Sequence, residues 1–210
     1  MGILDWFRTR DGEGGIVTKT IKGLRVFVNN TRPDIESDDV LQRVEDALGM
    51  IEEHARHHFR HMQRDFDGIL VERYACRGAY FPQERICLVE LTFTVNRDFS
   101  LAQVAATILH EAMHARLHEL GFPLEMEDRA RQERFCRRAE IEFGAAVPDG
   151  KAVVDRALAA LAAADHDVAP RIDPVLAAQR VAQADLEALD RPQWLKRSIA
   201  KWQGLDVPDA

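Results

Sequence analysis

Residues 100–121, SLAQVAATILHEAMHARLHELG, predict a helix whose start and end are both marked in the sequence. Ser100 and Gln103 have the spacing of a capping box, in which the serine side chain accepts from the Gln103 amide and the glutamine side chain reaches back. Gly121 stands where a residue of positive φ commonly ends a helix, and Pro123 follows it. We therefore expect one helix to carry the whole segment HEAMHARLH at positions 110–118.

The chain before this helix predicts a small sheet. Three segments read as strands: GLRVFVN (23–29), ILVERYA (69–75) and RICLVELTFTV (85–95). In the third segment every second residue from Cys87 to Val95 is apolar, whereas the alternate set becomes polar from Glu90 onward. This pattern is typical of a strand with one face in the core and one face partly open.

Helical patterns fill most of the remaining chain. Between the first two strands, apolar residues recur at helical spacing over residues 37–66. They are Val40, Val44, Ala47, Ile51, Ala55, Phe59 and Met62. Further helices are expected over about 125–146, 151–164 and 174–189. Strands followed by helices only predict an α+β fold with a small, mostly antiparallel sheet. We expect a flexible segment over 1–20, one domain over 21–148, and a helical extension over 149–210 packed on it.

Composition and charge exclude several classes of protein. The 210-residue chain has a formal net charge of −7, which does not suggest a nucleic-acid partner. Its three cysteines, Cys76, Cys87 and Cys136, are too few and too scattered for a disulfide framework. The N-terminus lacks the pattern of a signal peptide, and no segment approaches the roughly 20 apolar residues that cross a bilayer. We therefore expect a cytoplasmic protein without a membrane or nucleic-acid partner.

The HEAMH segment predicts metal chemistry. His110 and His114 are four residues apart, so they share one helix face and lie about 6 Å apart along the axis. Two imidazole nitrogens so placed can each lie roughly 2.1 Å from one zinc ion. Glu111 flanks the pair, where its carboxylate can take a proton from a zinc-activated water. The alternative is a helix on which these side chains are only solvated.

A third zinc ligand has to come from outside the HEAMH segment. His118 lies about 12 Å along the axis from His110, too far for one ion on a straight helix, so we expect it beside the site or at the surface. The following segment RQERFCRRAEIEFG offers Glu133, Glu140 and Glu142. Glu133 and Glu140 share a helix face beside an apolar row that includes Cys136, whereas Glu142 points away. We expect Cys136 to pack in the core.

The HExxH motif with a glutamate on the next helix resembles the gluzincin class of zinc metallopeptidases. The resemblance covers about residues 70–148, and it implies a zincin-like domain in which two histidines and that glutamate bind Zn²⁺ beneath an edge strand. Eighteen residues separate His114 from Glu133, as in several gluzincin families, and we expect Glu133 to be the third ligand. Glu140 fits the longer spacing of small single-domain relatives and stays an alternative; otherwise we expect it to orient a histidine or the zinc water. The chain departs from the family's Asn-Glu-x-x-Ser-Asp motif, because Arg137 stands where that motif has its aspartate.

The resemblance implies a zinc-dependent hydrolase, a peptidase that cleaves peptide bonds of a peptide or protein substrate with Glu111 as the general base. The open face of residues 86–95 would pair with the extended substrate. Tyr74 and Tyr80 are candidates to donate to the transition-state oxyanion, but packing in the core or at its rim is the interpretation that we favour for both. The alternative function is a zinc-binding regulatory or interaction module with lost or latent peptidase activity. A metal-free helical interaction protein is a third hypothesis.

A second histidine cluster, EEHARHHFRH, contains His54, His57, His58 and His61. His58 falls on the core face of its predicted helix, and the other three run along the flank. This cluster is either a second metal site or a set of histidines that face solvent or act as buffering groups. We favour the second interpretation.

Overall fold

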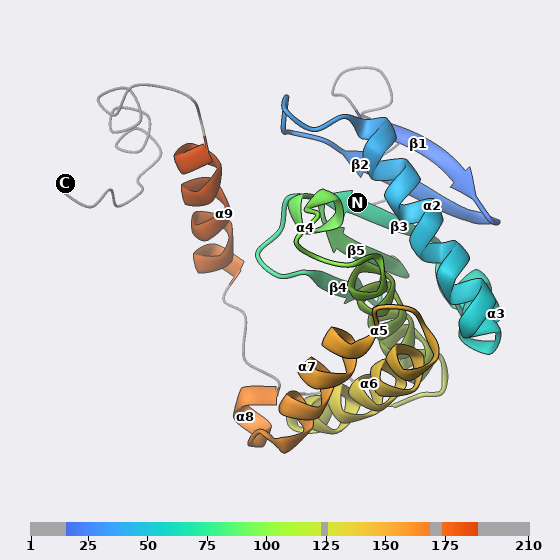
Figure 1. Ribbon diagram of the computed structural model, residues 1–210. Helices are drawn as coiled ribbons and strands as arrows, with labels where there is room; N and C mark the ends of the chain where they lie inside the picture. The colour runs from blue at the N-terminus through green and yellow to red at the C-terminus, as the bar shows by residue number, and fades with distance from the viewer. Residues whose placement is uncertain (1–15, 123–125, 169–173, 189–210) are drawn as a thin grey trace. The chain divides into compact units, whose positions relative to one another are not determined.

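Five strands form one mixed sheet in the computed structural model, which describes residues 16–122, 126–168 and 174–188 (Figure 1). The strands are β1 (Ile16–Ile21), β2 (Leu24–Asn29), β3 (Gly68–Glu72), β4 (Gly78–Phe81) and β5 (Ile86–Glu90). Their order across the sheet is β1-β2-β3-β5-β4. The expected α+β class is confirmed.

The expectation of a mostly antiparallel sheet is wrong at the centre of the sheet. β2 pairs with β3, and β3 with β5, in parallel; only the two edge strands, β1 and β4, pair antiparallel with their neighbours. For β2 and β3 the cause is the long helical connection between them, since a crossover of that length brings the chain back in the same direction.

β1 and β2 form a hairpin at one edge of the sheet. Residues 16–20, which we expected to be flexible, belong to β1 and pair with β2 in continuous register. The turn between them consists of Lys22 and Gly23, both with positive φ (48° and 84°). Two such residues form the turn whose twist matches that of paired strands.

The helix expected over residues 37–66 is two helices, α2 (Ser37–His54) and α3 (Arg56–Asp65). The break lies at Ala55, whose φ of −139° and ψ of 49° are not helical. All seven apolar residues predicted for the inner face are buried, so the predicted face is confirmed. The helical spacing of the apolar residues continues across the break, because Ala55 is the one residue between the two helices.

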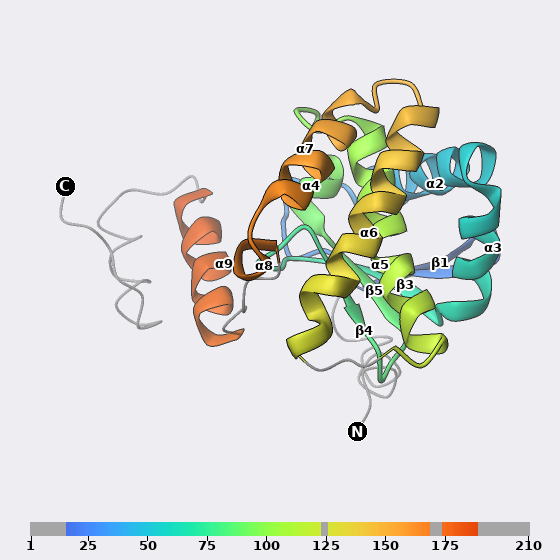
Figure 2. The same cartoon turned by 90° about the horizontal axis from the view of Figure 1, so that it is seen from below.

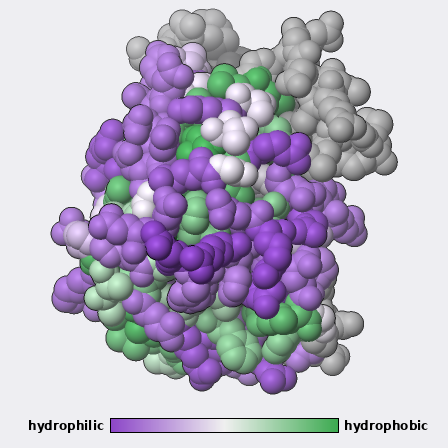
Figure 3. Space-filling view, turned by 90° about the vertical axis from the view of Figure 1, so that its right-hand side faces the viewer, coloured by the Kyte–Doolittle hydropathy of each residue, from purple (hydrophilic) through white to green (hydrophobic). Residues whose placement is uncertain are grey.

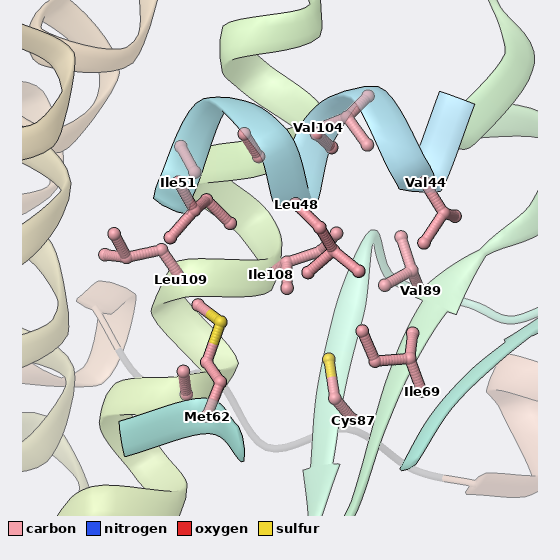
Figure 4. Close-up of a cluster of buried hydrophobic side chains, with 14 of the residues drawn as sticks. Val44, Leu48, Ile51, Met62, Ile69, Cys87, Val89, Val104, Ile108 and Leu109 are labelled. Atoms are coloured by element: carbon pink, nitrogen blue, oxygen red, sulfur yellow. The ribbon is translucent and has the colours of Figure 1, made fainter. Parts of the chain in front are cut away.

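The main core lies between one face of the sheet and three helices. α2, α3 and α5 (Leu101–Glu119) contact one another, and Figure 4 shows their side chains meeting those of β3 and β5. Ile108 and Leu109 of α5 pack there with Leu48 of α2, Met62 of α3 and Val89 of β5. Each such buried side chain contributes about 1.5–3 kcal/mol to folding. This core fixes α5 against the sheet.

The strand expected over residues 85–95 is wrong in its second half. β5 ends at Glu90, and α4 (Leu91–Val95) follows. The Glu90 side chain caps α4 by accepting from the Phe93 amide, and it is paired with Arg73. β5 also has no open face, because Cys87 and Val89 pack in the main core and Ile86 and Leu88 in a second apolar cluster on the other side.

The ends of α5 are as predicted. Ser100 and Gln103 form both hydrogen bonds of a capping box, and Gly121 follows the helix with a φ of 76°. The Phe122 amide donates to the carbonyl of Leu117, which closes the C-terminal turn. The prediction that one continuous helix carries residues 110–118 is therefore confirmed.

The C-terminal helices divide between two units of the chain, residues 1–170 and 171–210. In the first unit α6 (Met126–Ala146) packs along α5, and α7 (Lys151–Ala162) packs on α6 (Figure 2). α7, which lies in the extension that we expected over 149–210, belongs to the first unit, as does the short α8 (Asp165–Val168). The second unit contains α9 (Pro174–Ala188).

Candidate metal centre

His110 and His114 of α5 face α6, and Glu111 of the same helix lies against the edge strand β4. His110 and Glu111 are each 6% exposed, and the side chain of His114 is 15% exposed. The imidazole rings of His110 and His114 have centroids 5.0 Å apart. The capped, buried helix thus presents both rings on one face, as their four-residue spacing requires.

The Glu133 carboxylate of α6 lies against both imidazoles. Its oxygens are 3.2 Å from His110 Nε2 and 3.3 Å from His114 Nε2. Ligand atoms about 2.0–2.1 Å from one tetrahedral metal ion are separated by roughly 3.3 Å, which is close to both of these distances between imidazole and carboxylate. The donor types, two nitrogens and a carboxylate, also fit a divalent metal ion.

Cys136 lies at the same place. Its Sγ and one ring nitrogen of each histidine all lie within 4.8 Å of one another. The group of His110, His114 and Cys136 is thus also able to hold a metal ion. Our prediction that Cys136 packs in the core is confirmed by its full burial, but its position beside the two imidazoles was missed.

Glu140 is fully buried and hydrogen-bonds the other nitrogen of His110. Its Oε1 lies 3.0 Å from His110 Nδ1. Two guanidinium groups donate to the same carboxylate: Arg137 at 2.9 and 3.0 Å, and Arg156 of α7 at 3.1 Å. Glu140 thus holds the orientation of the His110 ring, and two arginines hold Glu140.

The charges of these groups are strongly coupled. Burial lowers the pKa of His110, but hydrogen bonds to Glu133 and Glu140 outweigh it and raise that pKa to about 10. Burial raises the pKa of the Glu133 carboxyl, and its hydrogen bonds to His110 and His114 outweigh that and bring the pKa far below its usual value. The site therefore favours positive charge between its carboxylates, the charge that a divalent ion supplies.

Glu111 and Cys136 respond mainly to burial. Burial raises the pKa of Glu111, although His110 and His114 act in the opposite direction. Burial also raises the pKa of the Cys136 thiol well above its ordinary value, and Glu133 adds to the effect.

The edge strand β4 passes directly over Glu111. A Cβ atom on Gly78 would lie 2.9 Å from Glu111 Oε1 and 2.7 Å from Thr107 Cγ2, so only glycine allows this approach. In the part of the chain that the structure describes, β4 pairs with β5 on one side and with no strand on the other. The strand with a free edge beside the site is therefore β4, whereas we expected residues 86–95 in that place.

Other side chains that the sequence suggested near the site lie either around it or away from it. Tyr80 of β4 approaches His118, with 3.5 Å between its hydroxyl and Nδ1, which places His118 beside the edge strand. Tyr74 packs against Phe81, in the cluster on the other face of the sheet. Glu142 is exposed, as expected.

Three histidine rings of α3 form a separate cluster. The ring centroids of His57 and His58 are 3.9 Å apart, and His61 lies 6.3 and 6.4 Å from them. His57 is exposed and His58 is buried. The side of the molecule where α3 lies is mostly hydrophilic (Figure 3).

His58 predicts an acid-sensitive contribution to stability. Burial, together with the charges of His57 and His61, lowers the pKa of His58 from 6.5 to about 4. Below pH 6.5 the unfolded chain takes up a proton that the folded chain refuses, so stability is lost as the pH falls from 6.5 towards 4. Allowing for partial access of water, we expect a loss of about 1–2 kcal/mol.

Urea unfolding at pH 7.5 and pH 4.5 measures this loss. His58→Gln should lose less free energy of unfolding between the two pH values than the wild type. His57→Gln should lose an intermediate amount, because the charge of His57 is one of the causes that lower the pKa of His58. An identical pH dependence in wild type and His58→Gln would show that His58 does not contribute.

Comparisons with known proteins give no relative. No family model, no curated protein and no solved structure matches the chain. Among the described helices none is both long and apolar enough to span a bilayer. Any function must therefore be argued from the site itself.

Proposed function

We propose that the protein is a zinc-dependent hydrolase that cleaves peptide bonds and is similar in its chemistry to the gluzincin metallopeptidases. One observation carries this proposal: Glu133 approaches both imidazoles at 3.2 and 3.3 Å, while the buried Glu111 lies beside them on the same helix.

The ligands of the proposed ion are His110, His114 and Glu133. A bound zinc ion supplies a Lewis acid for the substrate carbonyl and lowers the pKa of a water molecule that attacks it. Glu140 holds the His110 ring through Nδ1, a role that a carboxylate commonly has toward a metal-binding histidine.

Glu111 is the proposed general base. Its carboxylate takes the proton of the attacking water and then delivers it to the leaving amine. Burial beneath β4 keeps bulk water from this carboxylate, and the close passage of Gly78 brings the strand to its side.

The substrate is proposed to be an extended peptide that pairs with the free edge of β4. Backbone amides and carbonyls on such an edge bind a peptide without selecting its sequence. The four residues of β4 would then align the scissile bond above Glu111 and the two histidines.

The test is the hydrolysis of a broad peptide library by purified, zinc-loaded protein. We expect cleavage that a chelator abolishes and added zinc restores. Absence of cleavage across the library, in a protein that does bind zinc, would exclude the peptidase and leave the zinc-binding regulatory module. Cys136 is the observation that favours this second function, because a further ligand fits a closed, structural site.

Arg156 should affect metal affinity although it lies outside the ligand set. Its replacement by Met removes one of the two arginines that hold Glu140, so the His110 ring is less well oriented. Outer partners of this kind typically change metal affinity by about 10–100-fold, and we expect a drop of roughly tenfold.

Arg134→Met is the matched control for Arg156→Met. Arg134 has nearly the same side-chain exposure, 31% against 32%, and pairs with Asp165 instead of Glu140. Competition with a chromophoric chelator measures both zinc affinities. Equal zinc affinities in the two variants would show that Arg156 does not support metal binding.

A further inference from the structure

Cys136 stands on the same face of α6 as the two glutamates of the site. It follows Glu133 by three residues and precedes Glu140 by four, so successive helical turns direct all three side chains toward α5. Cys136 is fully buried, and its Sγ is within 4.8 Å of a nitrogen of His110 and of His114. The peptidase chemistry proposed above makes no use of this thiol.

We propose that the Cys136 thiolate is a fourth protein ligand of the metal and competes with water for the position that hydrolysis needs. This inference rests on the proposed metal centre. Zinc binds thiolate sulfur at about 2.3 Å and imidazole nitrogen at about 2.0–2.1 Å, which places sulfur and nitrogen roughly 3.6 Å apart around one ion. The upper limit of 4.8 Å thus leaves about 1 Å for the thiolate to move.

The fourth ligand decides whether the metal site is structural or catalytic. Structural zinc sites have four protein ligands, whereas catalytic sites have three and an open position. Two histidines with Glu133 leave a position open, and the addition of Cys136 fills it. A soft thiolate also favours zinc or cobalt over magnesium or manganese. The site is therefore partly latent: it binds its metal tightly and hydrolyses slowly while sulfur holds the fourth position.

Cobalt substitution tests this inference. Co²⁺ takes the same tetrahedral sites as Zn²⁺, and a cobalt–thiolate bond gives an intense near-ultraviolet charge-transfer band that nitrogen and oxygen ligands do not give. The full chain is loaded with Co²⁺, and its absorption spectrum is recorded together with the amount of bound cobalt. We expect one bound ion and a sulfur band in the wild type, and one bound ion without that band in Cys136→Ala.

Cys87→Ala is the matched control, because Cys87 is also fully buried and lies in β5 outside the group around the two histidines. It should keep both the bound cobalt and the band. With zinc bound, Cys136→Ala should hydrolyse peptides faster than the wild type and Cys87→Ala at the wild-type rate.

The possible failures are distinguishable. Bound cobalt without a sulfur band in the wild type would overturn the thiolate ligand and leave the proposed hydrolase intact. A sulfur band with equal zinc-dependent rates in wild type and Cys136→Ala would overturn the competition with water. No cobalt bound by the wild type or by either variant would overturn the metal centre itself, and the inference with it.

Discussion

Glu111→Gln is expected to lower kcat/KM for peptide hydrolysis by about 10²–10⁴-fold, the usual contribution of a general acid or base. The amide of glutamine has nearly the shape of the carboxylate but cannot accept a proton from water. Because Glu111 is not one of the proposed ligands, zinc affinity should stay close to that of the wild type. The loss should therefore appear in turnover and not in metal content.

Glu142→Gln is the control for the loss of a carboxylate near the site. Glu142 is exposed on α6, and its replacement should leave both turnover and zinc content unchanged. Steady-state kinetics with one cleaved peptide, together with metal analysis of the same samples, measures the two quantities. Cleavage by Glu111→Gln at the wild-type rate would show that Glu111 is not the general base.

Glu133→Gln is expected to reduce zinc affinity by at least about 100-fold, more than the loss of an outer partner of a ligand. The neutral amide keeps the size of the side chain and loses the negative charge that lies 3.2 and 3.3 Å from the two imidazoles. Turnover at limiting zinc should fall with the affinity, and excess zinc should restore part of it.

Glu140→Gln distinguishes the two candidate glutamates. Glu140 lies against His110 Nδ1 and two arginines, so its replacement should weaken zinc binding less than that of Glu133. Competition with a chelator ranks the two variants. The reverse ranking, with wild-type affinity in Glu133→Gln, would make Glu140 the third ligand and contradict the ligand set proposed here.

The parts of the fold that were predictable carry their own local signals. The helix α5 has a capping box at Ser100 and a glycine at 121, and the inner face of α2 and α3 repeats at helical spacing. The shared face of Glu133 and Glu140 followed from their seven-residue separation on one helix. These features depend on neighbours along the chain, and the sequence shows them directly.

Other elements depend on contacts that a single segment does not show. β1 contains Thr18, Lys19 and Thr20, all exposed, so no apolar alternation marks it as a strand in the sequence. β4 has four residues and no periodicity of its own.

Residues 91–95 favour a strand by composition, yet the buried Glu90 caps a helix there. Here a single side-chain contact outweighs local propensity, because Glu90 accepts from the Phe93 amide while it is paired with Arg73. A strand and a capped helix are not distinguished by the apolar pattern of this segment alone.

Two residues of the site, Cys136 and Arg156, could not be assigned to it from the sequence. Cys136 belongs to an apolar row of its helix, so the sequence predicted only core packing for it. Arg156 comes from α7, sixteen residues after Glu140, and only the packing of α7 on α6 brings them together. Both required the arrangement of helices in space.

Whether His110, His114 and Glu133 hold one divalent ion is best measured by a crystal structure of the zinc-loaded protein with anomalous data at the zinc edge. We expect one anomalous peak about 2.0–2.2 Å from a nitrogen of each histidine and from an oxygen of Glu133. Zinc-loaded crystals without a peak between the two imidazoles, or with the peak out of reach of Glu133, would contradict this ligand set.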